Sequence, residues 1–133
     1  MEELFTDLWQ VPRFTRRHGG FRPHVDCYLT ERPRALHVVV DLAGVDASKI
    51  QIWADDGTLV VSGERRRPRC VGQVYQQMEI EYGRFTRQVA LSAEVDVESA
   101  KATYKRGMLT IVFPLAERPA PAERIEITIR SSR

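Results

Sequence analysis

The chain has 133 residues, 43% of them hydrophobic, and a formal net charge of +2 at pH 7. This length fits one globular domain, and so small a net charge argues against nucleic-acid binding. No run approaches the roughly 18 to 20 apolar residues of a membrane span. Cys27 and Cys70 lack metal-ligand spacing, which predicts free thiols in a reducing compartment. The first residues lack the features of a secretion signal, so we expect a cytoplasmic protein.

An apolar stripe with helical spacing opens the chain. It consists of Met1, Leu4, Phe5, Leu8 and Trp9, at i, i+3, i+4, i+7 and i+8. A helix this short is not stable alone, so the stripe either packs on its own domain or contacts other protein surfaces. Residues 11–23 are rich in Arg, Gly and Pro and are expected to form a flexible linker.

Short alternating segments follow and predict β-strands. They cover residues 25–29, 36–42, 50–54, 59–63, 85–91, 102–105 and 108–113. Asp55, Asp56 and Gly57 favour a tight hairpin, so these two acids are interpreted as turn residues, not as a catalytic or metal site. Gly107 is expected to adopt a positive φ before the last of these strands, and Pro114 to end it.

The longest interruption, from Glu64 to Tyr82, is either disordered or functional. Its basic run, residues 65–69, is interpreted as a solvated loop. In the next strand, Arg87 falls on the same face as the apolar residues Phe85, Val89 and Leu91. A charged side chain on an apolar face needs a partner. That partner is either an acid of the same chain, such as Glu79 or Glu81, or a group across a subunit interface.

Beyond Pro114 the chain becomes Pro-rich and is expected to be an extended tether. Ile125, Ile127 and Ile129 then lie on one face of an extended strand. They either reach another subunit or form the last strand of their own domain.

The sequence contains no phosphate-binding loop, no G-x-S-x-G elbow and no histidine or cysteine pattern typical of a metal site. We therefore expect a protein that is not an enzyme and has no cofactor or bound metal.

Ala102-x-x-x-x-Gly107-Met108-Leu109 resembles the A-x-x-x-n-G-v-L signature of the alpha-crystallin domain of small heat-shock proteins. Ile125-Glu126-Ile127 resembles the tail motif of that family. Further matches, at residues 41–45, 57–65 and 83–91, keep their order and spacing from about Asp26 to Ile129. The chain departs from the pattern at Arg106, where the family often has Asn or Asp.

The resemblance implies an all-β, immunoglobulin-like antiparallel sandwich of about seven to nine strands. Its parts would be an N-terminal arm (residues 1–23), an alpha-crystallin domain (24–115) and a C-terminal tail (116–133). The implied function is an ATP-independent holdase that binds partly unfolded proteins, as a homodimer that assembles into a larger homo-oligomer. The alternative is a co-chaperone or scaffold of the p23 type that binds one folded partner.

The resemblance also implies site residues. A dimer interface would contain Tyr75, Glu79 and Arg87, with the segment from Glu64 to Tyr82 reaching the partner's sheet. The tail isoleucines Ile125, Ile127 and Ile129 would dock in a groove that includes Ile50 and Ile52. The client-binding arm would carry Leu4, Phe5, Leu8 and Trp9.

Overall fold

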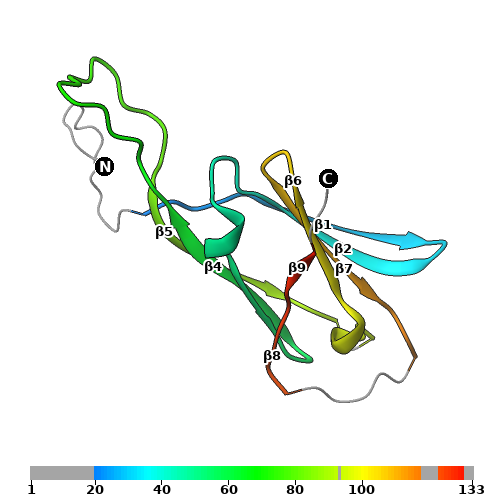
Figure 1. The fold of residues 1–133 in the computed structure, drawn as a ribbon. Coiled ribbons are helices and arrows are strands. Elements are labelled where there is room, and N and C mark those ends of the chain that lie inside the picture. The colour runs from blue at the N-terminus through cyan, green and yellow to red at the C-terminus, as the bar shows by residue number, and fades with distance from the viewer. Residues whose placement is uncertain (1–19, 93, 118–122, 131–133) are drawn as a thin grey trace, which may run out of the picture.

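The computed structural model describes residues 20–92, 94–117 and 123–130 (Figure 1). The predicted client-binding residues Leu4, Phe5, Leu8 and Trp9 lie outside these ranges. Within them the chain forms nine strands and two short 3-10 turns, η3 (Ala47–Lys49) and η4 (Val97–Ser99).

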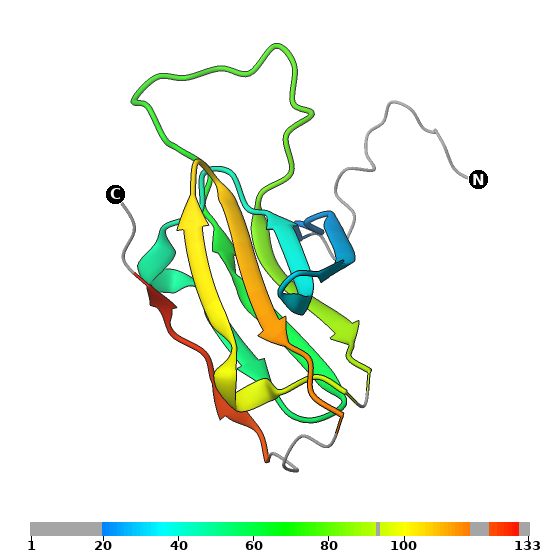
Figure 2. The same ribbon diagram turned by 90° about the vertical axis from the view of Figure 1, so that its right-hand side faces the viewer.

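The strands form two sheets packed face to face (Figures 1 and 2). The five-stranded sheet has the order β1 (Val25–Glu31), β2 (Arg34–Asp41), β7 (Met108–Pro114), β6 (Lys101–Lys105), β9 (Ile129–Arg130). The four-stranded sheet has the order β5 (Gly83–Ala90), β4 (Thr58–Arg65), β3 (Gln51–Ala54), β8 (Ile125–Glu126). Every pairing is antiparallel except that of β6 with β9. The prediction of an all-β antiparallel sandwich is confirmed.

The alternating residues of β2 and β7 supply the centre of the core. Five of them are fully buried between the sheets, Val38, Val40, Leu109, Ile111 and Phe113, and so is Leu42, one residue beyond β2. Burying each such side chain contributes roughly 1.5–3 kcal/mol. Val95 and Val97, in the loop before β6, are each only 2% exposed and close one end of the core.

The acids of the β3–β4 hairpin are turn residues, as the sequence predicts. Asp55 Oδ1 accepts hydrogen bonds from the backbone N–H groups of Gly57 (3.0 Å) and Thr58 (2.9 Å). These bonds stabilise the carboxylate and lower the pKa of Asp55 below its ordinary value. The Asp55 carboxylate therefore stabilises the turn by accepting hydrogen bonds from its backbone.

The β6–β7 hairpin is closed by Arg106 (φ 55°) and Gly107 (φ 81°). Two positive φ values are the requirement of a type I′ turn, whose twist matches that of the strands. Gly107 is further constrained because a Cβ added there would lie 2.8 Å from the Cα of Ala43. The turn also holds the β2–β3 loop, since the Gly107 carbonyl accepts from the Leu42 N–H at 2.8 Å.

We predict opposite effects of substitution at the two turn positions. Arg106→Asn should raise the free energy of unfolding by up to about 1 kcal/mol, because a left-handed conformation costs an ordinary residue about 1–2 kcal/mol and Asn tolerates it best. Gly107→Ala should lower it by more than 1 kcal/mol, since it adds a clash with Ala43 to the same backbone strain. Urea denaturation followed by circular dichroism measures both.

Gly72→Ala is the matched control, because Gly72 has φ 80° but nothing within 4 Å of an added Cβ. If Gly107→Ala cost no more than Gly72→Ala, the close packing of the turn on Ala43 would be of no consequence.

Candidate functional site

The C-terminal tail crosses the open side of the sandwich and joins the two sheets. Ile125 and Glu126 pair antiparallel with β3, and Ile129 and Arg130 pair parallel with β6. Between these pairings the Ile127 N–H donates to the carbonyl of Ile52 at 2.9 Å. The tail thus bonds to backbone groups on the edge strand of each sheet.

The three tail isoleucines differ in burial. Ile127 is 7% exposed and belongs to the core, whereas Ile125 and Ile129 are half-buried against it. Of the two predicted groove residues, Ile52 is 1% exposed and offers its carbonyl to the tail rather than a surface pocket. Ile50 is 9% exposed and lines a pocket beside the tail. The structure thus brings the predicted tail and groove residues together within one chain.

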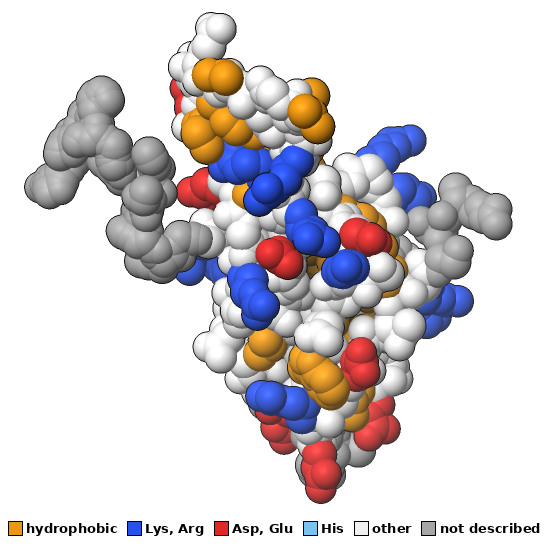
Figure 3. Space-filling view, turned by 60° about the vertical axis from the view of Figure 1, so that its left-hand side comes forward, with side chains coloured by type: hydrophobic (Ala, Val, Ile, Leu, Met, Phe, Trp, Pro, Cys, Tyr) orange, Lys and Arg blue, Asp and Glu red, His pale blue; other side chains and the backbone are white. Residues whose placement is uncertain are grey.

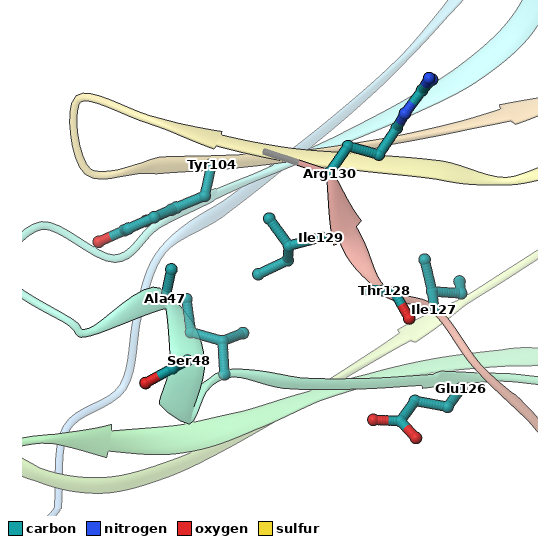
Figure 4. Close-up of a pocket in the computed structure, with 9 residues that line it drawn as sticks. Ala47, Ser48, Tyr104, Glu126, Ile127, Thr128, Ile129 and Arg130 are labelled. Carbon is teal, nitrogen blue, oxygen red and sulfur yellow. The ribbon is translucent and has the colours of Figure 1, made fainter. Parts of the chain in front are cut away.

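The pocket beside the tail has a volume of about 500 Å³. Figure 4 shows Ile129 pointing into the space between Tyr104 and Ala47, while Arg130 points away from it. The lining residues are Ala47, Ser48, Ile50, Tyr104, Glu126, Ile127, Thr128, Ile129 and Arg130. The tail therefore leaves the groove partly open at its η3 end.

Tyr104 connects this groove to the β2–β3 loop, and the sequence did not identify it as a site residue. Its hydroxyl lies 2.7 Å from the carbonyl oxygen of Leu42 and 2.8 Å from that of Val45. Burial raises the pKa of the Tyr104 phenol above its ordinary value, so the proton that these carbonyls need stays in place. Tyr104 lies two residues after the buried Ala102, so the alternation of the strand already indicated that both side chains point to the same face.

The segment between β4 and β5, residues 66–82, contains no strand and projects from the sandwich (Figure 2). We call it the exposed arm. Figure 3 shows hydrophobic side chains gathered on it above a cluster of basic ones. The large exposed apolar side chains of the arm are Val71, Val74, Tyr75, Met78 and Ile80, with exposures of 102%, 85%, 43%, 48% and 62%. So much uncovered apolar surface on one loop is typical of an interaction site.

Arg65 holds the base of the exposed arm, and the sequence assigned it only to a solvated basic run. Its guanidinium donates to the carbonyl of Glu81 from Nε (2.9 Å) and Nη2 (2.6 Å), and to that of Ala43 from Nη1 (3.0 Å). It also lies 3.7 Å from the ring centroid of Phe21, a cation–π contact. Arg65 therefore joins three segments that are distant in sequence.

The predicted dimer residues do not meet within one chain. Tyr75 lies 5.2 Å, ring centroid to guanidinium carbon, from Arg67, and Glu79 accepts from the Gln77 amide. Arg87 donates from Nη1 to the carbonyl of Pro23 at 2.6 Å. Among the described residues it makes no ion pair with Glu79 or Glu81, so the partner it finds in its own chain is a backbone carbonyl.

Arg87 lies beside the side of the sandwich that the tail does not reach. There β1 and β5 are edge strands, each paired on one side only. Tyr28 and Leu29 of β1 are 48% and 66% exposed. Partial burial and the Asp26 carboxylate raise the pKa of the Cys27 thiol, and the Arg87 guanidinium opposes this shift. An unpaired edge with exposed apolar side chains is suited to accept another strand.

Within the described ranges no group of three or more His, Cys, Asp or Glu side chains could hold a metal ion. The described residues also form no helix long and apolar enough to cross a membrane.

Comparison with known proteins agrees with this geometry. The chain is 37% identical over 138 residues to the 16.9 kDa class I heat shock protein 1 of Triticum aestivum, covering 93% of this chain and 91% of that one. It is 27% identical over 132 residues to heat shock protein 16 of Schizosaccharomyces pombe, covering 96% and 91%. The structure of hspA from Xanthomonas axonopodis superposes with a TM-score of 0.67 at 28% identity, over 77% of this chain and all (100%) of that one. A model of the Hsp20/alpha crystallin family matches residues 28–130. The chain therefore belongs to the Hsp20/alpha crystallin family.

Proposed function

We propose that this protein is an ATP-independent holdase, which binds partly unfolded proteins and prevents their aggregation without chemical catalysis. The observation that carries the proposal is the groove between β3 and β6, which is occupied by a short isoleucine tail. A groove that receives apolar side chains and the edge hydrogen bonds of a strand can accept similar segments of an unfolded chain.

The docked tail is suited to leave the groove. Fully burying an isoleucine contributes roughly 1.5–3 kcal/mol, and of the three only Ile127 is buried, while Ile125 and Ile129 are half-buried. The backbone hydrogen bonds of the tail contribute about 0.5–1.5 kcal/mol each. Ordering each backbone residue costs about 1–2 kcal/mol, so for a six-residue segment such as 125–130 this cost offsets most of the gain from side chains and hydrogen bonds. Heating can then shift the tail away from the groove and expose the apolar site beneath it.

The same contact links subunits when a tail docks on a neighbouring chain instead of its own. The Pro-rich sequence between Ala116 and Ile125 gives the tail its reach. Several weak contacts of this kind hold a large assembly while each one can still open.

Dimerisation is assigned to the exposed arm and to β1. The arm lies away from the body of its own domain, and β1 offers an unpaired edge. Charge favours the pairing, since Arg66, Arg67 and Arg69 of the arm would meet a strand that carries Asp26 and Glu31. Tyr75 and Glu79 would then approach Arg87 of the second subunit from the arm.

The reducing cytoplasm is the setting that we infer for this activity. Cys27 and Cys70 are both exposed free thiols, which fits a compartment that keeps thiols reduced.

The first test of the holdase proposal is suppression of aggregation. A client enzyme heated with a molar excess of this protein and no nucleotide should scatter little light, because exposed apolar segments are bound before they associate. Light scattering with an equal mass of an unrelated folded protein is the control. Equal scattering in both samples would contradict the holdase assignment and favour the p23-type alternative.

The second test concerns the dimer. Replacing Val74, Tyr75, Met78 and Ile80 together by Ser keeps the length of the arm but removes its apolar contacts, and should give monomers in sedimentation velocity. Deleting residues 73–78 should have the same effect. A dimer unchanged by both variants would exclude exchange of the arm.

The third test concerns the tail. Ile125→Ala with Ile127→Ala should give smaller assemblies, because both apolar anchors of the tail are lost. The free energy of unfolding should fall by less than the roughly 2–5 kcal/mol of a fixed core position, since the tail can leave its groove. Sedimentation and urea denaturation measure the two effects, and Thr128→Ala, an exposed neighbour, is the matched control.

The fluorescence of Trp53 reports which groove the tail occupies, because Trp53 of β3 pairs with Glu126 of the tail strand β8. The second tryptophan, Trp9, can be replaced by Phe so that it does not contribute to the signal. Docking on the same chain leaves its fluorescence independent of protein concentration, whereas docking on a neighbour does not. Should Ile129 also be replaced and the assembly still keep its full size, the tail would not link subunits.

A further inference from the structure

The outer face of the five-stranded sheet is a second surface, distinct from the free edge of β1 and from the tail groove. It consists of the outward side chains of β1, β2, β7 and β6, and Figure 2 looks onto it with β9 at one edge. Because Val38 and Val40 point into the core, their neighbours His37 and Val39 point outward. No described segment of the chain packs over this face in Figure 2.

The side chains at the centre of this face are suited to a sheet-on-sheet contact. Two cross-strand rows are Tyr28, His37, Val112, Lys101 and Asp26, Val39, Thr110, Thr103. The four central residues, His37, Val39, Thr110 and Val112, are half-buried and three of them are β-branched. The Tyr28 and His37 rings stack with centroids 4.7 Å apart and an interplanar angle of 5°. The centre thus offers a low surface of apolar and aromatic groups.

Charge is separated across the same face. Asp26 and Asp41 lie on β1 and β2, where the one basic residue, Arg34, is paired with Glu94 at 2.8 Å. Lys101 and Lys105 lie on β6, and neither β6 nor β7 contains an acidic residue. Arg130 of β9 extends the basic side. One half of the outer face is therefore acidic and the other half basic.

This separation makes the face complementary to itself. A second copy, turned by 180° about an axis parallel to the strands between β2 and β7, would lay its β6 over β1 and its β7 over β2. Asp26 would then face the second copy's Thr103, with that copy's Lys101 and Lys105 two residues to either side. Tyr28 would face the second copy's Lys101, in position for a cation–π contact.

We propose that the outer face is a contact surface for a second copy of this chain, stacked sheet on sheet about this two-fold axis. Four strands about 4.8 Å apart and about seven residues long span roughly 400 Å² per copy, half of the roughly 800 Å² of a stable interface. The contact is weak alone and acts between subunits that other contacts already link.

The test is a pair of charge variants of the full chain. Asp26→Lys with Asp41→Asn makes the face basic throughout, and Asn at position 41 keeps an oxygen for the Ala43 N–H (3.3 Å). Lys101→Glu with Lys105→Glu makes it mainly acidic. Each variant alone should shift the sedimentation profile to smaller assemblies, because like charges then oppose each other. The variant at Lys101 and Lys105 leaves β1 unchanged, so its effect is separate from any loss of the arm's contact with Asp26. An equimolar mixture, unfolded and refolded together, should return to the wild-type profile.

The control carries Lys at Gln51, Thr86 and Gln88, three exposed positions on the outer side of the other sheet, and so changes the net charge by the same three units as the basic variant. It should keep the wild-type profile, and circular dichroism verifies that every variant is folded. The proposal would be overturned if either variant alone kept the wild-type profile, or if the refolded mixture still formed only small assemblies. This face would then not contact a second copy of the chain. The readout is assembly size, so the outcome is separate from that of the aggregation assay.

Discussion

The edges of the two sheets are the constraint on which the rest of this structure depends. An edge strand presents a row of N–H and C=O groups that need a partner. On one side of the sandwich the edges, β3 and β6, are covered in part by the tail, whose residues pair first with one sheet and then with the other. On the other side β1 is uncovered, and β5 receives one backbone hydrogen bond, from the Phe21 N–H to the Arg84 carbonyl at 3.2 Å. Two of the three proposed subunit contacts, those of the tail and the arm, act at edges.

The β2–β3 loop connects these two sides. Tyr104 reaches its carbonyls at Leu42 and Val45 from the tail groove, and Arg65 reaches that of Ala43 from the base of the arm. The Leu42 carbonyl also accepts from the Val45 N–H at 3.0 Å, whereas a loop carbonyl without such a partner depends on water. The β2–β3 loop is therefore hydrogen-bonded both to the tail groove, through Tyr104, and to the base of the exposed arm, through Arg65. These bonds fix the position of the groove and of the arm's base relative to the core.

Much of the fold was predictable because local patterns carry it. Alternation placed Leu109, Ile111 and Phe113 in the core, and Gly107 was assigned a positive φ from its place in a hairpin. Arg65 and Tyr104 were not recognised, because their roles depend on carbonyls 22 and 62 residues away. No local pattern indicates such contacts. For the same reason Arg87 could be known to need a partner, but the Pro23 carbonyl could not be named.

The sequence by itself determined the sandwich, the positions of its hairpins, the long arm and the isoleucine tail, because period-2 hydrophobicity, glycine and proline act through neighbouring residues. The motifs from about Asp26 to Ile129 also indicated the family. Only the tertiary structure decided where the ends of these elements meet. It put the tail in the groove of its own chain, left β1 and the arm uncovered, and set an acidic half of the outer face beside a basic half. Sheet order and register decide such juxtapositions, and they arise from packing between segments far apart along the chain.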